Sequence, residues 1–399
     1  MLTVEEAQDA ILSRIEPLAV ERVEVMGALG RVLAEPVVSR ALIPPWANSS
    51  MDGYALRAAD TRGEPVELAV VGRIIAGSMP SRPLRAGEAM RIFTGAPLPD
   101  GADAVVPQED VAADGERVTI RGRIESGACV RPAGEDVRVG DVVVQPGHVV
   151  GAAEVGLLAT LGYSQVRVFR RPRVAVLSTG NELADLGTEP TPGQIPNTNT
   201  YSLMAQVLEA GAEPINLGVA PDRLESITER LQWGLAADVL VTSAGVSVGE
   251  LDLVRDALER CGAELHLWQV SMRPGKPITF GTRAGRPVFG LPGNPVSAMV
   301  TFELFVRPAL RRMAGARAVD RPRVRARALE AIANPGFRRG YLRVTLTRDG
   351  NGYGARLTGD QGSAILRSMV LADGLAVVAG DTTIPAGDAV DVILLRAPS

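Results

Sequence analysis

The sequence predicts a multidomain α/β protein: a doubly wound α/β domain accompanied by an N-terminal helical part, a β-rich insert and a small C-terminal β-barrel-like domain. The chain has 399 residues, and at about 150 residues per domain this length indicates two to four domains. The hydrophobic pattern also changes period along the chain, from helical spacing to β runs, then to alternating strands and helices, and back to β runs.

Two helical patterns open the chain, in MLTVEEAQDAILSRI and in VEVMGALGRVLAEPV, and they stop at Pro44-Pro45. Short β runs separated by Gly and Pro turns follow from 46 to 140, and helical spacing returns in GAAEVGLLATLG. If this later helix packs with the N-terminal ones, the β-rich part is an insertion. We therefore predict these domains: 1–45 with 141–171, 46–140, 172–317 and 318–399.

From Arg173 the chain alternates between near-continuous apolar strands and amphipathic helices, and ends this part with a long helix from Pro295 to about Met313. Such alternation is typical of a parallel sheet covered by helices on both faces. After about residue 317 the β pattern resumes in YLRVTLTRDG, LAVVAGD and AVDVILL, between Gly-rich turns. This last part predicts a separate small β domain.

Composition excludes several classes of function. Lys and Arg total 42 against 46 Asp and Glu, giving a net charge of −4, without the basic excess of a nucleic-acid binder. The 2 Cys form no CxxC pair, and the 2 His leave little material for a His-based triad or metal site; His266 reads as an ordinary strand residue. No signal peptide or transmembrane run is recognisable, so we expect a soluble, cytoplasmic protein that binds neither nucleic acid nor membrane.

Three loops leave strands at the edge of the predicted sheet where ligands bind in α/β proteins. They are STGNEL, TSAGVSVGELD and LPGNPVS, and all are rich in Gly and hydroxyl groups. Their backbone amides suit a polyanion, and the turn RPGKP adds Arg273 and Lys276. Acids beside phosphates require a hard cation such as Mg²⁺, which makes Glu182, Asp222 and Asp252 candidate metal ligands.

Structural explanations remain open for each feature taken alone. A Gly-rich loop after a strand is usually a tight turn, and Asp222 also suits a helix N-cap before RLESIT. NSSMDGYAL and IFTGAPLPDGAD, in the β-rich part, read equally as turns stabilised by side-chain to backbone bonds. GxxxxGK[ST] is absent and no GxGxxG follows a strand, so an ordinary P-loop or NAD enzyme is excluded.

The chain resembles the molybdopterin molybdenumtransferase family, the MoeA-type enzymes that include the C-terminal catalytic domain of gephyrin. Eight motifs occur in the family's order: PPWANSSMDGYAL, IFTGAPLPDGADAVVPQED, VRPAGEDVRVGD, LSTGNEL, GVSVGELD, VSMRPGKPITFG, LPGNPVSA and QGSAILRSM. The resemblance implies a four-domain homodimer whose active site lies between the α/β domain of one subunit and the β-rich insert of the other. It implies a reaction in which adenylylated molybdopterin and molybdate give molybdenum cofactor and AMP.

The same resemblance implies roles for residues at matching positions. Asp52 and Thr94 would lie near the pterin, Glu182, Asp222 and Asp252 would serve Mg²⁺, and these five form the candidate catalytic set. Arg131 and Asp136 would shape the molybdate region, and Arg273 and Lys276 would hold phosphate. The remaining candidate substrate-binding residues are Ser178, Thr179, Gly180, Ser243, Gly245, Ser247, Gly249, Pro292, Gly293, Asn294, Pro295 and Ser363.

Two positions depart from the family's pattern, which usually has Gly-Gly where this chain has Ala244-Gly245 and Lys where it has Arg273. Arg keeps the charge, whereas Ala244 would be unfavourable only if its φ is positive. Two alternatives remain: a molybdopterin adenylyltransferase, which would need little beyond residues 171–316, and a non-catalytic gephyrin-like scaffold, which the intact acids disfavour. Tungstate could replace molybdate, and the pathway's adenylyltransferase is a conceivable partner.

Overall fold

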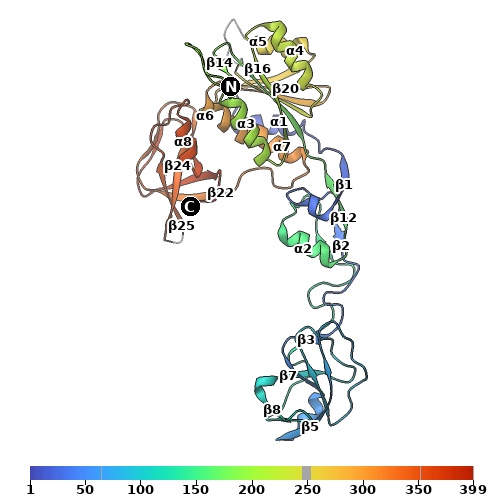
Figure 1. Cartoon of the computed structure of the whole chain (residues 1–399). Coiled ribbons are helices and arrows are strands. Elements are labelled where there is room, and N and C mark those ends of the chain that lie inside the picture. The colour runs from blue at the N-terminus through green and yellow to red at the C-terminus, as the bar shows by residue number, and fades with distance from the viewer. Residues whose placement is uncertain (64, 245–252, 351, 399) are drawn as a thin grey trace. The chain divides into compact units, whose positions relative to one another are not determined.

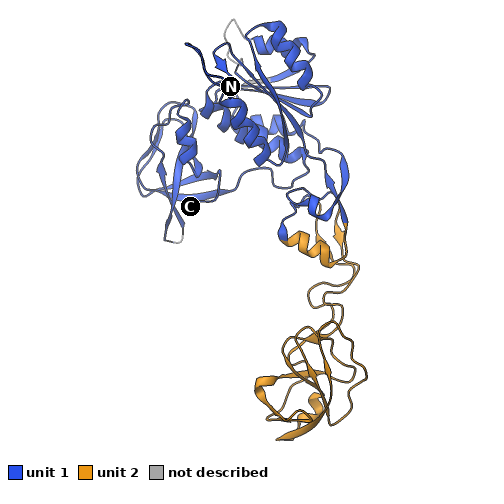
Figure 2. Ribbon diagram, in the orientation of Figure 1, with its two compact units in different colours: residues 1–34, 147–152, 165–399 blue, residues 35–146, 153–164 orange. Residues whose placement is uncertain are grey.

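The computed structural model describes residues 1–63, 65–244, 253–350 and 352–398 (Figure 1). Its contacts group the chain into two compact units, coloured in Figure 2. Unit 1 comprises Met1–Ala34, Gly147–Ala152 and Gln165–Ser399, and unit 2 comprises Glu35–Pro146 and Ala153–Ser164. None of the described helices combines the length and apolar character needed to cross a bilayer.

Unit 1 contains the predicted α/β domain, built on a six-stranded sheet. In spatial order the strands are β16 (Glu213–Ala220), β13 (Arg173–Thr179), β17 (Val239–Ser243), β21 (Arg286–Leu291), β20 (Pro277–Arg283) and β18 (Glu264–Gln269). The expectation of a wholly parallel sheet is wrong at one strand, because β20 is antiparallel to both neighbours. A short connection from Arg283 to Arg286, with Ala284 and Gly285 at positive φ, turns the chain back on itself as a hairpin.

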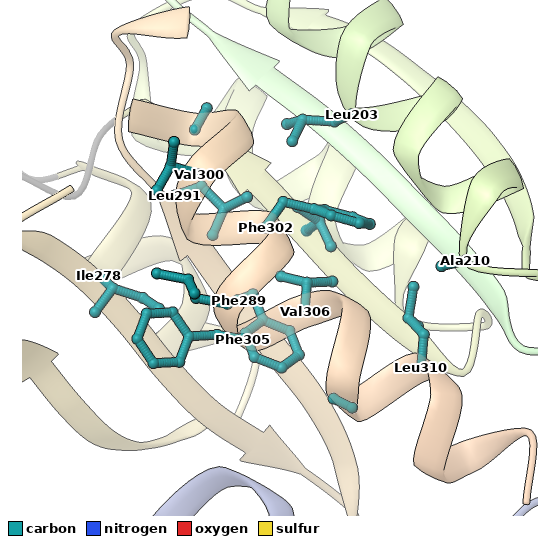
Figure 3. Close-up of a cluster of buried hydrophobic side chains, with 14 of the residues drawn as sticks. Leu203, Ala210, Ile278, Phe289, Leu291, Val300, Phe302, Phe305, Val306 and Leu310 are labelled. Atoms are coloured by element: carbon teal, nitrogen blue, oxygen red, sulfur yellow. The ribbon is translucent and has the colours of Figure 1, made fainter. Parts of the chain in front are cut away.

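Both faces of the sheet are buried, as expected for a doubly wound domain. Along β13, Val174 and Val176 enter one apolar cluster and Ala175 and Leu177 enter another, because successive strand residues point to opposite faces. The first cluster is closed by α1, α3 and α6 to α7, and the second by α4 and α5 (Figure 3 shows part of the first). These helices are α1 (Val4–Leu12), α3 (Asn199–Glu209), α4 (Leu224–Gly234), α5 (Leu253–Arg260), α6 (Pro295–Thr301) and α7 (Arg307–Met313).

The helical run predicted from Pro295 to Met313 is present, with a π-helical turn η4 (Phe302–Val306) between α6 and α7. Pro308 accounts for this turn, since its ring lacks an N–H and clashes with the carbonyl four residues earlier. That carbonyl belongs to Leu304, and it instead accepts a hydrogen bond from the Gln8 side chain at 2.8 Å. A side chain of α1 thus donates a hydrogen bond to the Leu304 carbonyl, which cannot receive one from Pro308 within its own helix.

The second predicted N-terminal helix is wrong. Residues 20–28 form β1 (Val20–Glu24) and the 3₁₀ turn η1 (Val25–Ala28), and β1 pairs with β12 (Gln165–Phe169). Val20, Val23 and Val25 favour a strand, and Gly27 and Gly30 weaken a helix. The predicted helix near 151–162 is confirmed as α2 (Ala152–Thr160), and in unit 2 β2 (Val37–Val38) pairs with β11 (Val142–Val144).

The C-terminal part of unit 1 is a closed barrel, as predicted. Its strands are β24 (Arg339–Asp349), β25 (Gly352–Leu357), β22 (Arg323–Ala328), β28 (Ala389–Leu394) and β26 (Gly374–Val378), and the pairing of β24 with β26 closes it. β19 (Met272–Arg273) pairs in parallel with the start of β24. The accessory elements of this part are β23 (Ile332–Asn334), β27 (Thr382–Ile384) and α8 (Leu366–Leu371).

Unit 2 holds the β-rich sheet that the short runs predict. In order its strands are β7 (Ala104–Pro107), β4 (Gly53–Leu56), β6 (Glu88–Ile92), β5 (Val66–Ile74), β9 (Arg117–Ile120) and β8 (Val111–Ala113). A separate ribbon pairs β3 (Asn48–Ser49) with β10 (Val130–Arg131), and 3₁₀ turns η2 (Ala58–Thr61) and η3 (Gln108–Asp110) connect strands. Apolar residues of β4 alternate between two clusters, one on each face of the sheet.

Candidate active site

A cavity of about 550 Å³ opens at the carboxyl edge of the α/β sheet. From β13 the chain runs through α3 to β16 on one side, and then returns to β17 on the other, so the strand order reverses between β13 and β17. Ligands of open α/β sheets bind at such a reversal. Described residues from each of the three predicted loops meet here, since residues at or just after the ends of β13, β17 and β21 line one cavity together with Ala364.

The STGNEL loop supplies the carboxylate of Glu182 to the lining of this cavity, beside Thr179. Gly180 has a φ of 149°, and a Cβ there would lie 2.5 Å from a Glu182 carboxylate oxygen. Only glycine adopts this backbone and leaves room for the side chain. After Glu182 the chain forms the two-residue strand β14 (Leu183–Ala184), which pairs with β15 (Ile195–Pro196).

Asp222 holds the same loop from the neighbouring strand end. Its Oδ2 accepts the Asn181 amide at 3.1 Å, and its own amide donates to Asn181 Oδ1 at 3.1 Å. The N-cap explanation for Asp222 is wrong, because α4 begins at Leu224 and its N-cap residue is Arg223. Asp222 therefore binds the loop through one carboxylate oxygen, and its second oxygen has no partner among the described residues.

Asn199, which sequence reasoning missed, ties the other two loops together. Its Nδ2 donates to Ser243 Oγ at 2.7 Å and to the Gly293 carbonyl at 2.6 Å. Asn199 is the first residue of α3, and its polarity in the run NTNT gives no sign of this role. Ser178 differs from these residues, because it is fully buried and hydrogen-bonded to Thr200 Oγ1 at 2.7 Å, inside the domain and outside the cavity lining.

The LPGNP loop and the C-terminal domain border the cavity together. Gly293, Asn294 and Pro295 line it, while Pro292 is buried just before them. The amide of Val296 donates to the Ser363 carbonyl at 3.0 Å, so the QGSA segment lies against the start of α6. Ser363 thus contacts the start of α6 through its backbone carbonyl and its neighbour Ala364 lines the cavity, while a role for the Ser363 side chain stays a prediction.

Arg273 and Lys276 do not line this cavity. They lie on the turn between β18 and β20, where the Arg273 guanidinium donates to the Pro335 carbonyl at 3.3 Å. A Cβ on Gly275, between them, would lie 2.5 Å from Thr301 Oγ1, so the turn packs closely against α6. The Arg273 guanidinium is thus associated with the C-terminal domain, and the backbone of the turn at Gly275 with α6.

Arg343 is a second residue that sequence reasoning missed. It is fully buried in the barrel, donates to the Gly362 carbonyl at 3.0 Å and to Ser368 Oγ at 3.0 Å, and so fixes the segment that carries Ser363. Burial lowers the pKa of Arg343 to about 10, opposed by the charge of Asp360 and reinforced by that of Arg273. A buried arginine inside the strand YLRVTL leaves no pattern that distinguishes it from an exposed one.

In unit 2, the turns NSSMDGYAL and IFTGA meet at Asp52 and Thr94. Asp52 Oδ1 accepts the Thr94 amide at 2.8 Å and the Thr94 hydroxyl at 2.7 Å. These hydrogen bonds, with a smaller contribution from the charge of Arg91, hold the pKa of Asp52 below its ordinary value. Asp52 is therefore an ionised carboxylate at neutral pH, fixed by one oxygen.

Arg131 and Asp136 lie in the segment that passes this turn. Arg131 pairs through its backbone with Asn48 in the β3–β10 ribbon, and the Asp136 amide donates to the Ile43 carbonyl at 2.9 Å. Both residues are exposed. The predicted residues Gly245, Ser247, Gly249 and Asp252 lie outside the described residues.

Comparisons with known proteins decide the family. Family models match residues 2–162 (MoeA N-terminal region, domains I and II), 175–312 (probable molybdopterin binding domain) and 325–395 (MoeA C-terminal region, domain IV). A molybdopterin molybdenumtransferase of Nostoc is 39% identical over 95% of this chain and 89% of its own length. Molybdopterin molybdenumtransferase 1 of Mycobacterium tuberculosis is 37% identical over 99% of both chains.

The chain belongs to the molybdopterin molybdenumtransferase family. A crystal structure of a molybdopterin biosynthesis MoeA protein from Pyrococcus horikoshii aligns with a TM-score of 0.87 at 30% identity, covering 99% of this chain and all of that one. The chain is accordingly a transferase of the MoeA type, and its fold is that of these enzymes.

The backbone conformation of Ala244 shows the physical effect of this departure from the family pattern. Its φ is 73°, a left-handed conformation that costs a residue with a Cβ about 1–2 kcal/mol. A Cβ placed on Gly293 would lie 3.2 Å from the Ala244 Cβ, so this methyl group sits directly beside the LPGNP loop. Because its φ is positive, Ala244 is unfavourable at this position, where glycine would not be.

A Mg²⁺ site is compatible with the oxygen donors that face the cavity. Glu182 offers a carboxylate and Thr179 and Ser243 offer hydroxyl groups, which are hard ligands of the kind that Mg²⁺ prefers. Within the described ranges no group of three or more His, Cys, Asp or Glu side chains is arranged to hold a metal. Of the three predicted ligands, Glu182 lines the cavity, Asp222 is outside its lining and Asp252 lies outside the described residues, so the three-acid Mg²⁺ site stays a prediction.

Proposed function

We propose that this chain catalyses the last step of molybdenum cofactor assembly, in which adenylylated molybdopterin and molybdate yield molybdenum cofactor and AMP. The observation that carries the proposal is the cavity at the strand reversal, where loops from three parallel strands and the C-terminal domain surround one volume containing Glu182. A nucleotide pyrophosphate requires amides from several directions and a cation between phosphate and carboxylate. Membership of the molybdenumtransferase family supports the same substrates.

The residues of this site bind and orient the substrate, and no covalent nucleophile is required. Glu182, Asp222 and Asp252 would hold Mg²⁺, and the ion would supply positive charge that offsets the negative charges of the phosphates. Thr179, Ser243 and the LPGNP backbone hold the phosphates in place. Asp52 and Thr94 lie near the pterin, where molybdate joins the dithiolene sulfurs, and Arg131 and Asp136 shape the molybdate region.

The two halves of the site come together in a homodimer in this proposal, with the α/β domain of one subunit facing the β-rich insert of the other. The four domains are 1–45 with 141–171, 46–140, 172–317 and 318–399. The enzyme works in the cytoplasm and receives its substrate from the adenylyltransferase of the pathway. Tungstate is the alternative oxyanion substrate.

Release of AMP from adenylylated molybdopterin tests the reaction directly. Wild type and Glu182→Gln are compared with Mg²⁺, and with molybdate or tungstate added separately. We expect oxyanion-dependent AMP release that falls at least about 100-fold in the variant, since loss of a charged ligand removes metal and phosphate stabilisation together. AMP that stays on the pterin with either anion, while ATP and molybdopterin become joined, would instead identify an adenylyltransferase.

Mixing two inactive variants tests the shared site. If Glu182→Gln and Asp52→Asn subunits exchange at random, half of the dimers combine one of each and carry one intact site. Activity should then return to about one quarter of wild type, because each symmetric dimer has two equivalent sites. A mixture that stays inactive after exchange, verified by sedimentation and a tagged subunit, contradicts a site built from both subunits.

A further inference from the structure

Two arginines of unit 2 lie against one aromatic ring beside the Asp52–Thr94 turn. The guanidinium carbon of Arg73 lies 4.7 Å from the centroid of the Phe93 ring, and that of Arg91 lies 4.9 Å from it. Arg73 on β5 and Arg91 on β6 are directly paired in the sheet, so they share one face. Phe93 follows β6 directly and precedes Thr94.

The charges of this arginine pair are not balanced by carboxylates in direct contact. Arg91 donates to the Gly53 carbonyl at 3.0 Å and to the Gln108 side chain, both neutral acceptors. Among the described residues neither Arg73 nor Arg91 makes an ion pair, and the Arg73 side chain makes no hydrogen bond; Arg91 also lies over the Tyr54 ring, 5.1 Å from its centroid. Two like charges side by side on a sheet repel one another, and a bound anion would offset that repulsion.

The location connects this pair to the chemistry of the turn. Arg91 reaches the carbonyl of the residue that follows Asp52, and its charge also stabilises the ionised form of Asp52. The Asp52 carboxylate thereby offsets part of the positive charge of Arg91. The guanidinium N–H groups of Arg73 have no hydrogen-bond partner among the described residues and remain free for a ligand. A guanidinium presents parallel N–H groups that match two oxygens of a tetrahedral oxyanion.

We propose that Arg73 and Arg91, held on Phe93, form an oxyanion-binding subsite that delivers molybdate to the Asp52–Thr94 turn. The subsite rests on the proposed function for the identity of its ligand. The ligand that fits this pair is a tetrahedral dianion, a class that includes phosphate and sulfate as well as molybdate. Binding measured with each anion distinguishes among them. Arg131, on the separate β3–β10 ribbon, is not part of this pair.

The kinetic test compares Arg73→Gln with Arg117→Gln in the full-length enzyme. Arg117 lies on β9 of the same sheet, is exposed and is paired with Glu67 at 3.0 Å, so its loss changes the net charge equally at a different place. We expect Arg73→Gln to raise the KM for molybdate about tenfold with little change in kcat, as for loss of a charge-assisted hydrogen bond. Arg73→Lys should recover part of the loss, and Arg117→Gln should remain within about twofold of wild type.

Direct binding of molybdate alone provides a second readout, measured by equilibrium dialysis with metal analysis. Wild type should bind molybdate in preference to equal concentrations of phosphate or sulfate, and Arg73→Gln should bind about tenfold more weakly. If Arg117→Gln weakens molybdate binding equally, the loss reflects the net charge of the protein and not a site at Arg73. If binding and KM are unchanged in Arg73→Gln, Arg73 does not contact molybdate. A preference for phosphate would reassign the pair to the phosphate of the substrate. Wild type that binds molybdate through Arg73 but releases no AMP would contradict the proposed function alone.

Discussion

The cavity of the α/β sheet and the Asp52–Thr94 turn place their polar groups by different means. In the cavity, strands end side by side, and the loops that follow are held by a few side-chain bonds such as those of Asn199. In the turn, a single carboxylate oxygen collects both donors of Thr94 from a neighbouring strand end. The cavity therefore depends on how the domain is packed, whereas the turn depends on local hydrogen bonds, and substitutions should separate the two.

The largest effect is expected from Asp52→Asn. Its side chain keeps an Oδ1 that can accept the Thr94 amide, so the turn should persist, but the negative charge is lost. We expect molybdate-dependent AMP release to fall about 100-fold with an unchanged melting temperature, as for removal of an acid that takes part in proton transfer or charge stabilisation. A large drop in melting temperature with Asp52→Asn would show that the turn is structural.

Gly180→Ala should affect both stability and activity. The added Cβ enters a left-handed backbone and the space of the Glu182 carboxylate, at a cost of about 1–3 kcal/mol. Displacement of Glu182 should also lower AMP release about tenfold. Urea unfolding and initial rates measure the two effects, and Gly187→Ala, at a φ of 88° with open space around its Cβ position, is the control for backbone strain alone.

Asn199→Ala should lower stability more than it lowers kcat. Ser243, which is buried, loses the donor at its hydroxyl, and the Gly293 carbonyl loses another, which costs about 1–3 kcal/mol in total. Ser202→Ala is the matched control, because its hydroxyl only donates to the Asn199 carbonyl at 3.2 Å. Chemical denaturation that shows equal losses for both variants would contradict a link between the two loops.

Ala244→Gly should stabilise the protein. Relief of the left-handed strain, about 1–2 kcal/mol, exceeds the entropy that glycine adds to the unfolded chain, about 0.5–1 kcal/mol. A gain of about 1 kcal/mol should appear as a melting temperature raised by roughly 2 °C. A lower melting temperature would mean that packing of the methyl group on Gly293 outweighs the strain.

The smallest effect concerns pH. The folded-state pKa of Asp52 lies below its ordinary value of 3.8, so its stabilising contribution is complete above that value and is lost as pH falls through the folded-state pKa. Any stability difference between wild type and Asp52→Asn should therefore be constant from about pH 7 to pH 5 and vanish in stronger acid. Thermal unfolding of both proteins across this range provides the measurement, and a difference that grows as the pH falls would contradict the assignment.

The sequence predicted the sheet-edge cavity better than the details within it. Strand and helix periods placed Glu182, Asn294 and Ser243 near one another because parallel strands bring their carboxyl ends to one edge. The antiparallel β20 was missed because a short apolar strand has the same pattern in either direction, and the helix expected near residue 25 gave way to pairing between β1 and β12, 141 residues apart at Glu24 and Gln165. Arg343 and Asn199 act through partners distant in sequence, which no local pattern encodes.

The bond between Gln8 and the Leu304 carbonyl has a consequence for how the chain is made. The two residues are 296 positions apart, and α1 buries Val4, Ala7 and Ile11 in a cluster that includes the helix Leu304 belongs to. During synthesis, α1 leaves the ribosome long before the helical run that contains Leu304. Until that run is made, the apolar face of α1 is exposed to water or bound by a chaperone. α1 is therefore among the last parts of unit 1 to acquire its final environment, although it is translated long before Leu304.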